Sequence, residues 1–338
     1  MPILGLWLPS TEVQVLIGFH LFILLMLALD LGVFQRRAHA ISIREAAVWS
    51  AVWISFALLF ALGIWQFWYV WRPEEAHKGL DKSIEFLTGY LIEKSLSVDN
   101  LFVFLVIFRY FAVRPAYQHR VLLWGIVGAL ILRATLIVLG AALLAVFHWM
   151  IYVFGVFLLY TAYKLAVSKE EHIDPSRNRV LRLLRRFFPV ADDHDTPHFW
   201  FRRDGRLFIT PLLIVLIVVE STDVVFALDS IPAIFAVTRD VFIVYTSNVF
   251  AILGLRALYF LLAGFLGLFR YLHFGLAGVL AFVGLKMLLE EQLRPYLESH
   301  GISDRGTILI SLSVVACILS IAIVASLVAG PSPKRDVE

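Results

Sequence analysis

The chain has 338 residues, of which 60% are hydrophobic and 16% charged, and its formal net charge is +3. A soluble domain carries about 25% charged and 45–50% apolar residues, so the composition argues against a soluble protein and for a membrane protein. The single cysteine, Cys317, excludes disulfides and CxxC redox chemistry within the chain. The small net charge is not the signature of a nucleic-acid partner.

Nine apolar runs predict nine transmembrane helices in one all-α membrane domain over 1–338. A helix of about 20 apolar residues crosses a hydrocarbon core of about 30 Å. The fourth and fifth runs are separated by only a few residues, which predicts a tight helical hairpin. The predicted spans cover 13–34, 43–69, 82–108, 118–146, 149–167, 208–236, 241–264, 271–290 and 306–329.

The distribution of Lys and Arg predicts the orientation. The loops after the odd-numbered spans hold roughly three times as many of these residues as the loops on the other side, which places them in the cytoplasm. The N-terminus is then outside and the C-terminus inside a bacterial cytoplasmic (inner) membrane. The first apolar run has no basic residues before it, so we interpret it as an uncleaved span.

The segment 168–207 is the only sizeable stretch between spans. Residues 180–188 predict a short basic amphipathic helix on the anionic inner leaflet. Residues 199–209 predict a β-hairpin around a turn at Asp204 and Gly205.

Ionisable residues inside two of the spans are the most informative feature. The third span carries Glu93 followed six residues later by Asp99, and the sixth carries Asp223 followed six residues later by Asp229. Such residues are expensive in a bilayer and usually mark an ion or substrate pathway. Six residues place two side chains about 120° apart and about 9 Å along a helix, so one helix alone does not build a metal site. Glu220 precedes Asp223 by one turn.

The order of these residues indicates an internal repeat. Each acid pair is followed by an arginine in the next span and a lysine in the one after, first in residues 82–167 and again in 208–290. Three spans are an odd number, so the second copy is inverted, which is the construction of many secondary transporters with ion sites at the repeat interface. Spans 13–34, 43–69 and 306–329 lie outside the repeat. The cations of the repeat are Arg133 and Lys164, then Arg256 and Lys286.

These cations have simpler interpretations as well. Arg133 and Arg256 are predicted to be structural counter-ions of the acids. Lys164 and Lys286 lie near span ends, where a lysine can snorkel to the interface. The acids outnumber the cations, and this excess of carboxylate favours a cation or proton site over salt bridges alone.

The available ligands are oxygen atoms. They include the amide of Asn100, hydroxyls such as those of Ser95, Thr222 and Ser230, and the carbonyl of Leu228, which Pro232 leaves without its helical donor. Oxygen ligands favour the hard cations Mg²⁺, Ca²⁺ and Mn²⁺. Neighbouring buried carboxylates also share protons, so exchange of a divalent cation for protons is a natural chemistry for the site.

Three stretches resemble the TerC/Alx family of membrane proteins, and its Alx branch in particular: FLTGYLIEKSLSVDN at 86–100, VESTDVVFALDSIPAIFAV at 219–237, and TSNVFAILGLRALYFLL at 246–262. The resemblance implies a LysE-like transporter fold and manganese(II) export, with links to metal homeostasis, alkaline stress and tellurite resistance. By motif match, it implies that the transport site consists of Glu93, Asp99, Asn100, Glu220, Asp223 and Asp229.

The leading hypothesis is therefore a secondary Mn²⁺ exporter driven by proton exchange, with no enzymatic activity and no tightly bound cofactor. We expect the two repeats to bring Asp99 and Asp229, with Asp223 or Glu220, into one coordination sphere. The alternative is a membrane stress-response scaffold, or a redox or tellurite-resistance modulator, in which the acids form only structural ion pairs. An intramembrane aspartyl protease is disfavoured, because the sequence contexts of its two aspartates are absent.

Overall fold

A computed structural model describes residues 11–34, 42–167, 198–203, 206–263 and 271–330, and these are almost wholly helical. Since residues 168–197 lie outside this part, the amphipathic helix expected at 180–188 is not described. The elements are α1 (Thr11–Phe34), α2 (Ile43–Trp71), the 3₁₀ helix η1 (Pro73–Lys78), α3 (Gly79–Tyr110), α4 (Pro115–Val146), α5 (Met150–Val167), β1 (Trp200–Arg203), β2 (Arg206–Ile209), α7 (Pro211–Phe235), α8 (Val241–Leu253), α9 (Leu255–Ala263), α10 (Leu272–Ser299) and α11 (Asp304–Ala329).

The helices coincide with the predicted apolar runs. By length and composition, six described helices can cross a membrane, namely α2, α4, α5, α7, α10 and α11. The pair α8 and α9 adds a seventh if it counts as one span. Helix α3 carries several ionisable residues and is not among them, while α1 contains a shorter apolar stretch, Gln14–Ala28. The structure thus describes an all-α membrane protein, and the number of nine spans stays a prediction.

Two predicted spans differ in shape from the helices observed. The run 241–264 is not one straight helix, because α8 and α9 are bent by 42° at Gly254. Helix α10 continues well past the expected end at 290, as far as Ser299, and contains Pro295. The pattern of apolar residues predicts where a span lies, but it does not predict a bend within the span or a polar extension of the helix. This explains both differences.

Local sequence signals fix several helix starts. Pro115 and Pro211 occupy the first positions of α4 and α7, where a missing N–H costs nothing. The Asp240 carboxylate caps α8 by accepting hydrogen bonds from the backbone N–H groups of Phe242 and Ile243, at 3.1 and 3.4 Å. Strand β1 pairs antiparallel with β2, with Trp200 opposite Ile209, in the hairpin expected there.

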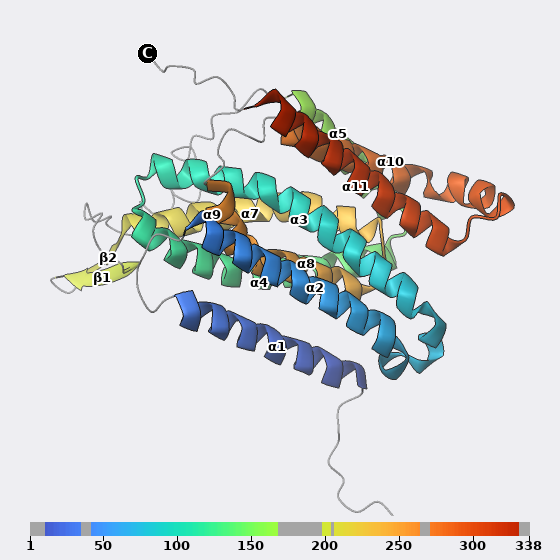
Figure 1. The fold of residues 1–338 in the computed structure, drawn as a ribbon, viewed down its shortest axis with the longest axis horizontal. Helices are drawn as coiled ribbons and strands as arrows, with labels where there is room; N and C mark the ends of the chain where they lie inside the picture. The colour runs from blue at the N-terminus through green and yellow to red at the C-terminus, as the bar shows by residue number, and fades with distance from the viewer. Residues whose placement is uncertain (1–10, 35–41, 168–197, 204–205, 264–270, 331–338) are drawn as a thin grey trace, which may run out of the picture.

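The helices of the two predicted repeats are interleaved. Helix α3 packs on α8 and on α7, α4 packs on α7 and on α8, and α5 packs on α10. In Figure 1, α1 lies at one flank of the bundle, while α5, α10 and α11 form the other. The acid-bearing helices α3 and α7 therefore lie in contact within the body of the molecule.

Glycines allow α5 and α10 to approach closely. A Cβ atom added at Gly284 of α10 would lie 2.9 Å from the backbone oxygen of Gly155, and one added at Gly155 would lie 2.8 Å from the Leu288 side chain. Backbone cannot move aside as a side chain can. Small residues at such crossings are the usual means of packing helices in a membrane.

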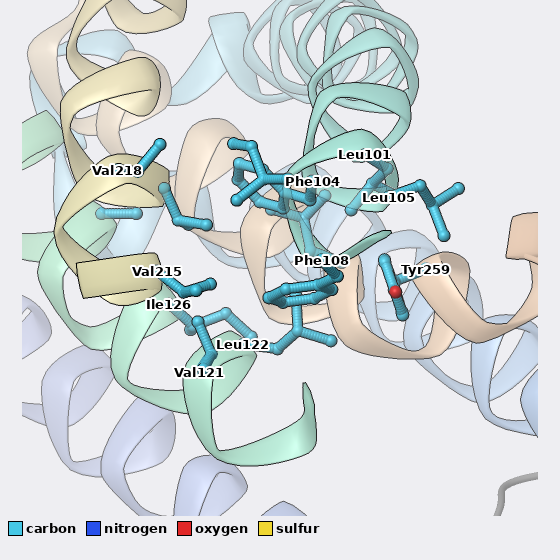
Figure 2. Close-up of a cluster of buried hydrophobic side chains, with 14 of the residues drawn as sticks. Leu101, Phe104, Leu105, Phe108, Val121, Leu122, Ile126, Val215, Val218 and Tyr259 are labelled. Atoms are coloured by element: carbon cyan, nitrogen blue, oxygen red, sulfur yellow. The ribbon is translucent and has the colours of Figure 1, made fainter. Parts of the chain in front are cut away.

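An apolar cluster fills the space between α3, α4, α7 and α9 near the end of the bundle where α3 ends. Figure 2 shows Phe104 and Phe108 of α3 facing Val121 and Ile126 of α4, with Val215 of α7 nearby. We call this the apolar plug, and its members are Leu101, Phe104, Leu105, Phe108, Val121, Leu122, Ile126, Val215, Val218 and Tyr259.

The close contact between α5 and α10 predicts that Gly284→Ala lowers stability by about 1–3 kcal/mol, as overpacking does elsewhere. Gly63→Ala in α2 is the matched control, because nothing lies within 4 Å of the added methyl group. Thermal unfolding in detergent measures both. Equal unfolding temperatures for the two variants would contradict the packing described here.

Candidate functional site

Arg133 of α4 is the centre of a buried ion-pair network. Its side chain is 1% exposed. Its Nε and Nη2 atoms donate to the two carboxylate oxygens of Asp223, at 3.2 and 3.0 Å. Its Nη1 donates to the Glu93 carboxylate and, at 3.3 Å, to the Ser230 hydroxyl. The prediction that Arg133 is a counter-ion of the acids is therefore confirmed.

The network joins four helices. Glu93 belongs to α3, Asp223 and Ser230 to α7, and Arg133 to α4, so the arginine connects both predicted repeats. Glu93 is fully buried, and it also accepts hydrogen bonds from the Asn248 amide of α8 at 3.2 Å and from the Ser97 hydroxyl at 3.4 Å. Each buried charge in this network thus has a partner, as burial in an apolar medium requires.

Asn248 was missed as a site residue by sequence reasoning. It lies in α8, which is otherwise almost wholly apolar, and an amide in such a segment is the signal that could have identified it. Its Oδ1 atom is buried and accepts no hydrogen bond from any residue that the structure describes. A free buried acceptor beside Glu93 is one more oxygen suited to a cation or a proton donor.

Glu220 lies against a glycine face of α4. A Cβ atom added at Gly128 would overlap the Glu220 carboxylate, whereas one at Gly125 would stand at an ordinary 3.8 Å from it. The Glu220 Oε1 atom is buried, and no described residue donates a hydrogen bond to it. The absence of a side chain at Gly128 thus makes room for an acid that has no cation beside it among the described residues.

Asp99 and Asp229 lie apart from the Arg133 network. Asp99, on α3, is partly buried and makes no hydrogen bond or ion pair with any described residue, while its neighbour Asn100 is 3% exposed. Asp229 accepts a hydrogen bond from Thr161 of α5 at 3.0 Å. Lys164, on the same helix as Thr161, is close enough to attract the Asp229 carboxylate electrostatically.

The other predicted residues are more loosely related to the acids. The hydroxyls of Ser95 and Thr222 donate to the carbonyls of Leu91 and Val219 in their own helices, at 2.6 and 2.7 Å. Their oxygens still have lone pairs to offer. Of the remaining cations of the repeat, Arg256 is buried at 2% exposure and Lys286 is partly buried.

The acids do not meet in one coordination sphere. Among the described residues, no group of three or more His, Cys, Asp or Glu side chains is placed to hold a metal ion. The expected convergence of Asp99 and Asp229 with Asp223 or Glu220 is therefore not seen. Arg133 accounts for the difference, since it holds Asp223 and Glu93 while Asp99 and Asp229 face other neighbours.

A polar network lies at the end of the bundle opposite the apolar plug. Lys82 bonds to Glu85 at 2.8 Å, and Thr238 donates to the same carboxylate. Asp240 pairs with Arg72 at 3.4 Å and lies 3.7 Å from Lys82. We call these five residues the polar lock. They join the ends of α2, α3 and α8 and the turn after α7.

Comparison with known proteins places this arrangement in a family. Residues 78–334 match the family described as "Integral membrane protein TerC family". The chain belongs to the TerC family. This match includes every residue of the Arg133 network and both acid pairs.

Several relatives align over most of their length. The chain is 50% identical to "Uncharacterized membrane protein STKORF319" of Myxococcus xanthus, over 92% of this chain and 91% of that one. It is 47% identical to "Putative membrane-bound redox modulator Alx" of Salmonella typhi, over 91% and 92%. The Alx protein of Escherichia coli K12 is 50% identical over 80% and 84%. The expected resemblance to the TerC/Alx family is thus confirmed, and no solved structure matches the chain.

The network predicts unequal effects of removing two acids. Asp223→Asn leaves Arg133 with Glu93 as its one carboxylate and is expected to cost about 1.5–3 kcal/mol of stability, as losing a hydrogen bond to a charged group does. Asp99→Asn is the matched control, because Asp99 bonds to no described residue, and it is expected to be neutral or stabilising. Thermal unfolding of both variants tests this, and a greater loss in Asp99→Asn would refute the ion-pair assignment.

Proposed function

We propose that this protein is a secondary transporter that exports manganese(II) from the cytoplasm in exchange for protons. One observation carries the proposal: two carboxylates from different helices, Glu93 and Asp223, converge on a buried site inside a membrane protein. Asp99 and Glu220 lie nearby in sequence, and neither pairs with a cation among the residues that the structure describes. Buried ionisable groups of this kind mark ion and proton pathways.

The chemistry of the donors supports a hard divalent cation. Carboxylate, amide and hydroxyl oxygens surround the site, and the described residues near it include no histidine or cysteine. Such donors suit Mn²⁺, Mg²⁺ and Ca²⁺, and the family resemblance favours Mn²⁺ among them. The cation is the substrate and not a resident cofactor. Carboxylates that lose the cation can take up protons, which provides the exchange.

The interleaved helices support an inverted-repeat transporter. Contacts occur in reciprocal pairs: α3 with α8 and α4 with α7, the first helix of each repeat against the second of the other. Helices α5 and α10, the third of each repeat, pack together. A two-fold relation between halves produces such reciprocity, and alternating access then follows from rocking one half against the other.

Contacts at the two ends of the bundle are consistent with alternating access. The apolar plug packs the helices together where α3 ends, and the polar lock joins helix ends where α3 begins. In the proposed topology, with the N-terminus outside and the C-terminus in the cytoplasm of a bacterial inner membrane, the plug is on the cytoplasmic side. An exporter would open the plug to load Mn²⁺ and the lock to release it.

A membrane stress-response scaffold or redox modulator remains the second candidate. Arg133 pairs with both Glu93 and Asp223, as it would in a structural ion-pair network, and relatives carry the name "Putative membrane-bound redox modulator Alx". This candidate predicts no metal flux and a phenotype that depends on the segment 168–207. Deleting that segment while flux is measured separates the two functions.

Flux through proteoliposomes tests the transporter directly. Asp99→Asn and Asp229→Asn should each lower Mn²⁺ flux by at least about tenfold, which corresponds to losing about 1.4 kcal/mol of interaction. Mn²⁺ flux measured at two pH values shows whether transport is coupled to protons. Competition by Mg²⁺ and Ca²⁺ shows how selective the site is for Mn²⁺. If both variants transport Mn²⁺ as well as the unmodified protein does, the proposal fails.

The contact of Glu220 with α4 gives a further prediction. Gly128→Ala would push the Glu220 carboxylate away from α4 and should lower Mn²⁺ flux, because the acid leaves its position. Gly125→Ala, one turn earlier on the same helix, makes only ordinary contacts and should leave flux unchanged. Equal flux in the two variants would show that the position of Glu220 is unimportant for transport.

A further inference from the structure

The Arg133 guanidinium occupies the place where Glu93 and Asp223 could share a metal ion. All three of its nitrogens are engaged: Nε and Nη2 with Asp223, and Nη1 with Glu93 and Ser230. A planar guanidinium matches carboxylates in this two-pronged manner. The two carboxylates are therefore held together by a cation that belongs to the protein itself.

The charges of this group are not balanced. One guanidinium faces two carboxylates, all of them buried, so the three side chains carry one excess negative charge when ionised. A divalent cation in place of the guanidinium would neutralise both acids. Because charge is costly at low dielectric, this excess favours the approach of a cation more strongly than a neutral triad would.

A hollow of about 390 Å³ borders α4 next to position 133. It lies beside Ala134, Ile137 and Val138 of α4 and is bounded also by residues of α1, α2 and α8. Its walls are mainly apolar. On this side, neighbouring helices therefore do not cover α4 completely.

We propose that Arg133 is a built-in competitor of the transported cation: it holds Glu93 and Asp223 when no metal is bound, and an entering divalent cation displaces it. This inference rests on the proposed function and adds the residue that regulates the same site. When Arg133 pairs with Glu93 and Asp223 again, it helps to expel the metal ion. It also prevents the two carboxylates from remaining unpaired in the emptied site.

Binding of Mn²⁺ to the purified full-length protein tests the proposal. The loss of the free Mn²⁺ signal in electron paramagnetic resonance gives the dissociation constant. Arg133→Gln, which keeps polarity without the competing charge, should bind Mn²⁺ about tenfold more tightly, within the usual range of coupling between two ligands. Arg133→Lys keeps the charge but not the two-pronged contact with Asp223, so its affinity should lie between the two.

The control and a second readout separate competition from a merely structural role. Arg305→Gln removes an exposed arginine that pairs with Asp81 and should leave Mn²⁺ affinity unchanged. In proteoliposomes, Arg133→Gln should transport more slowly despite its tighter binding, since nothing helps to displace the ion. A structural role would lower affinity and transport together.

Two results would overturn the proposal. One is an affinity of Arg133→Gln equal to or weaker than that of the unmodified protein, while thermal unfolding shows a cooperative fold. If Arg133→Gln does not fold, Arg133→Lys decides, and its failure to bind Mn²⁺ more tightly is the second. Either result leaves the proposed function standing, because that depends on Mn²⁺ flux by the unmodified protein. Absence of that flux overturns the proposed function instead.

Discussion

The ion-pair network at Arg133 constrains how the helices at the centre of this protein are placed. A guanidinium with 1% exposure can be kept in an apolar bundle only if carboxylates surround it, and these come from α3 and α7. The positions of three helices are thereby tied to one another at a single point. Asn248 adds α8 through its hydrogen bond to Glu93. Removing Arg133 would leave two buried carboxylates without a cation, and removing either acid would leave the guanidinium with one carboxylate, so the network acts as a unit.

Close helix packing surrounds this charged centre. The contact of Gly155 with Gly284 joins α5 to α10, and Gly128 gives Glu220 its place against α4. In a membrane, lipid tails compete equally with apolar side chains, so shape and small residues decide which helices associate. The site therefore depends as much on where side chains are missing as on where charges are present.

The sequence predicted the helices and the candidate site residues better than it predicted the contacts between them. Apolar runs mark helices because the bilayer and the bundle interior both exclude polar side chains, and isolated charges in these runs stand out. Arg133 could be recognised as a counter-ion for that reason. The partners of Arg133 could not be recognised, because periodicity shows which face of a helix is buried but not which neighbouring helix that face contacts. Asp99 and Asp229 were expected together, yet α5 stands beside Asp229 through Thr161. The break at Gly254 and the role of Gly128 likewise depend on tertiary contacts.

Different physical interactions hold the helices together at the two ends of the bundle. Opening the polar lock separates Lys82 and Arg72 from Glu85 and Asp240, and dissolved salt screens such attractions near the surface. Opening the apolar plug exposes Phe104, Phe108 and their neighbours to water, which raises the heat capacity and depends steeply on temperature. Ionic strength and temperature therefore act on opposite ends of the helical bundle. A change in salt concentration would loosen the polar lock while leaving the apolar plug as it was.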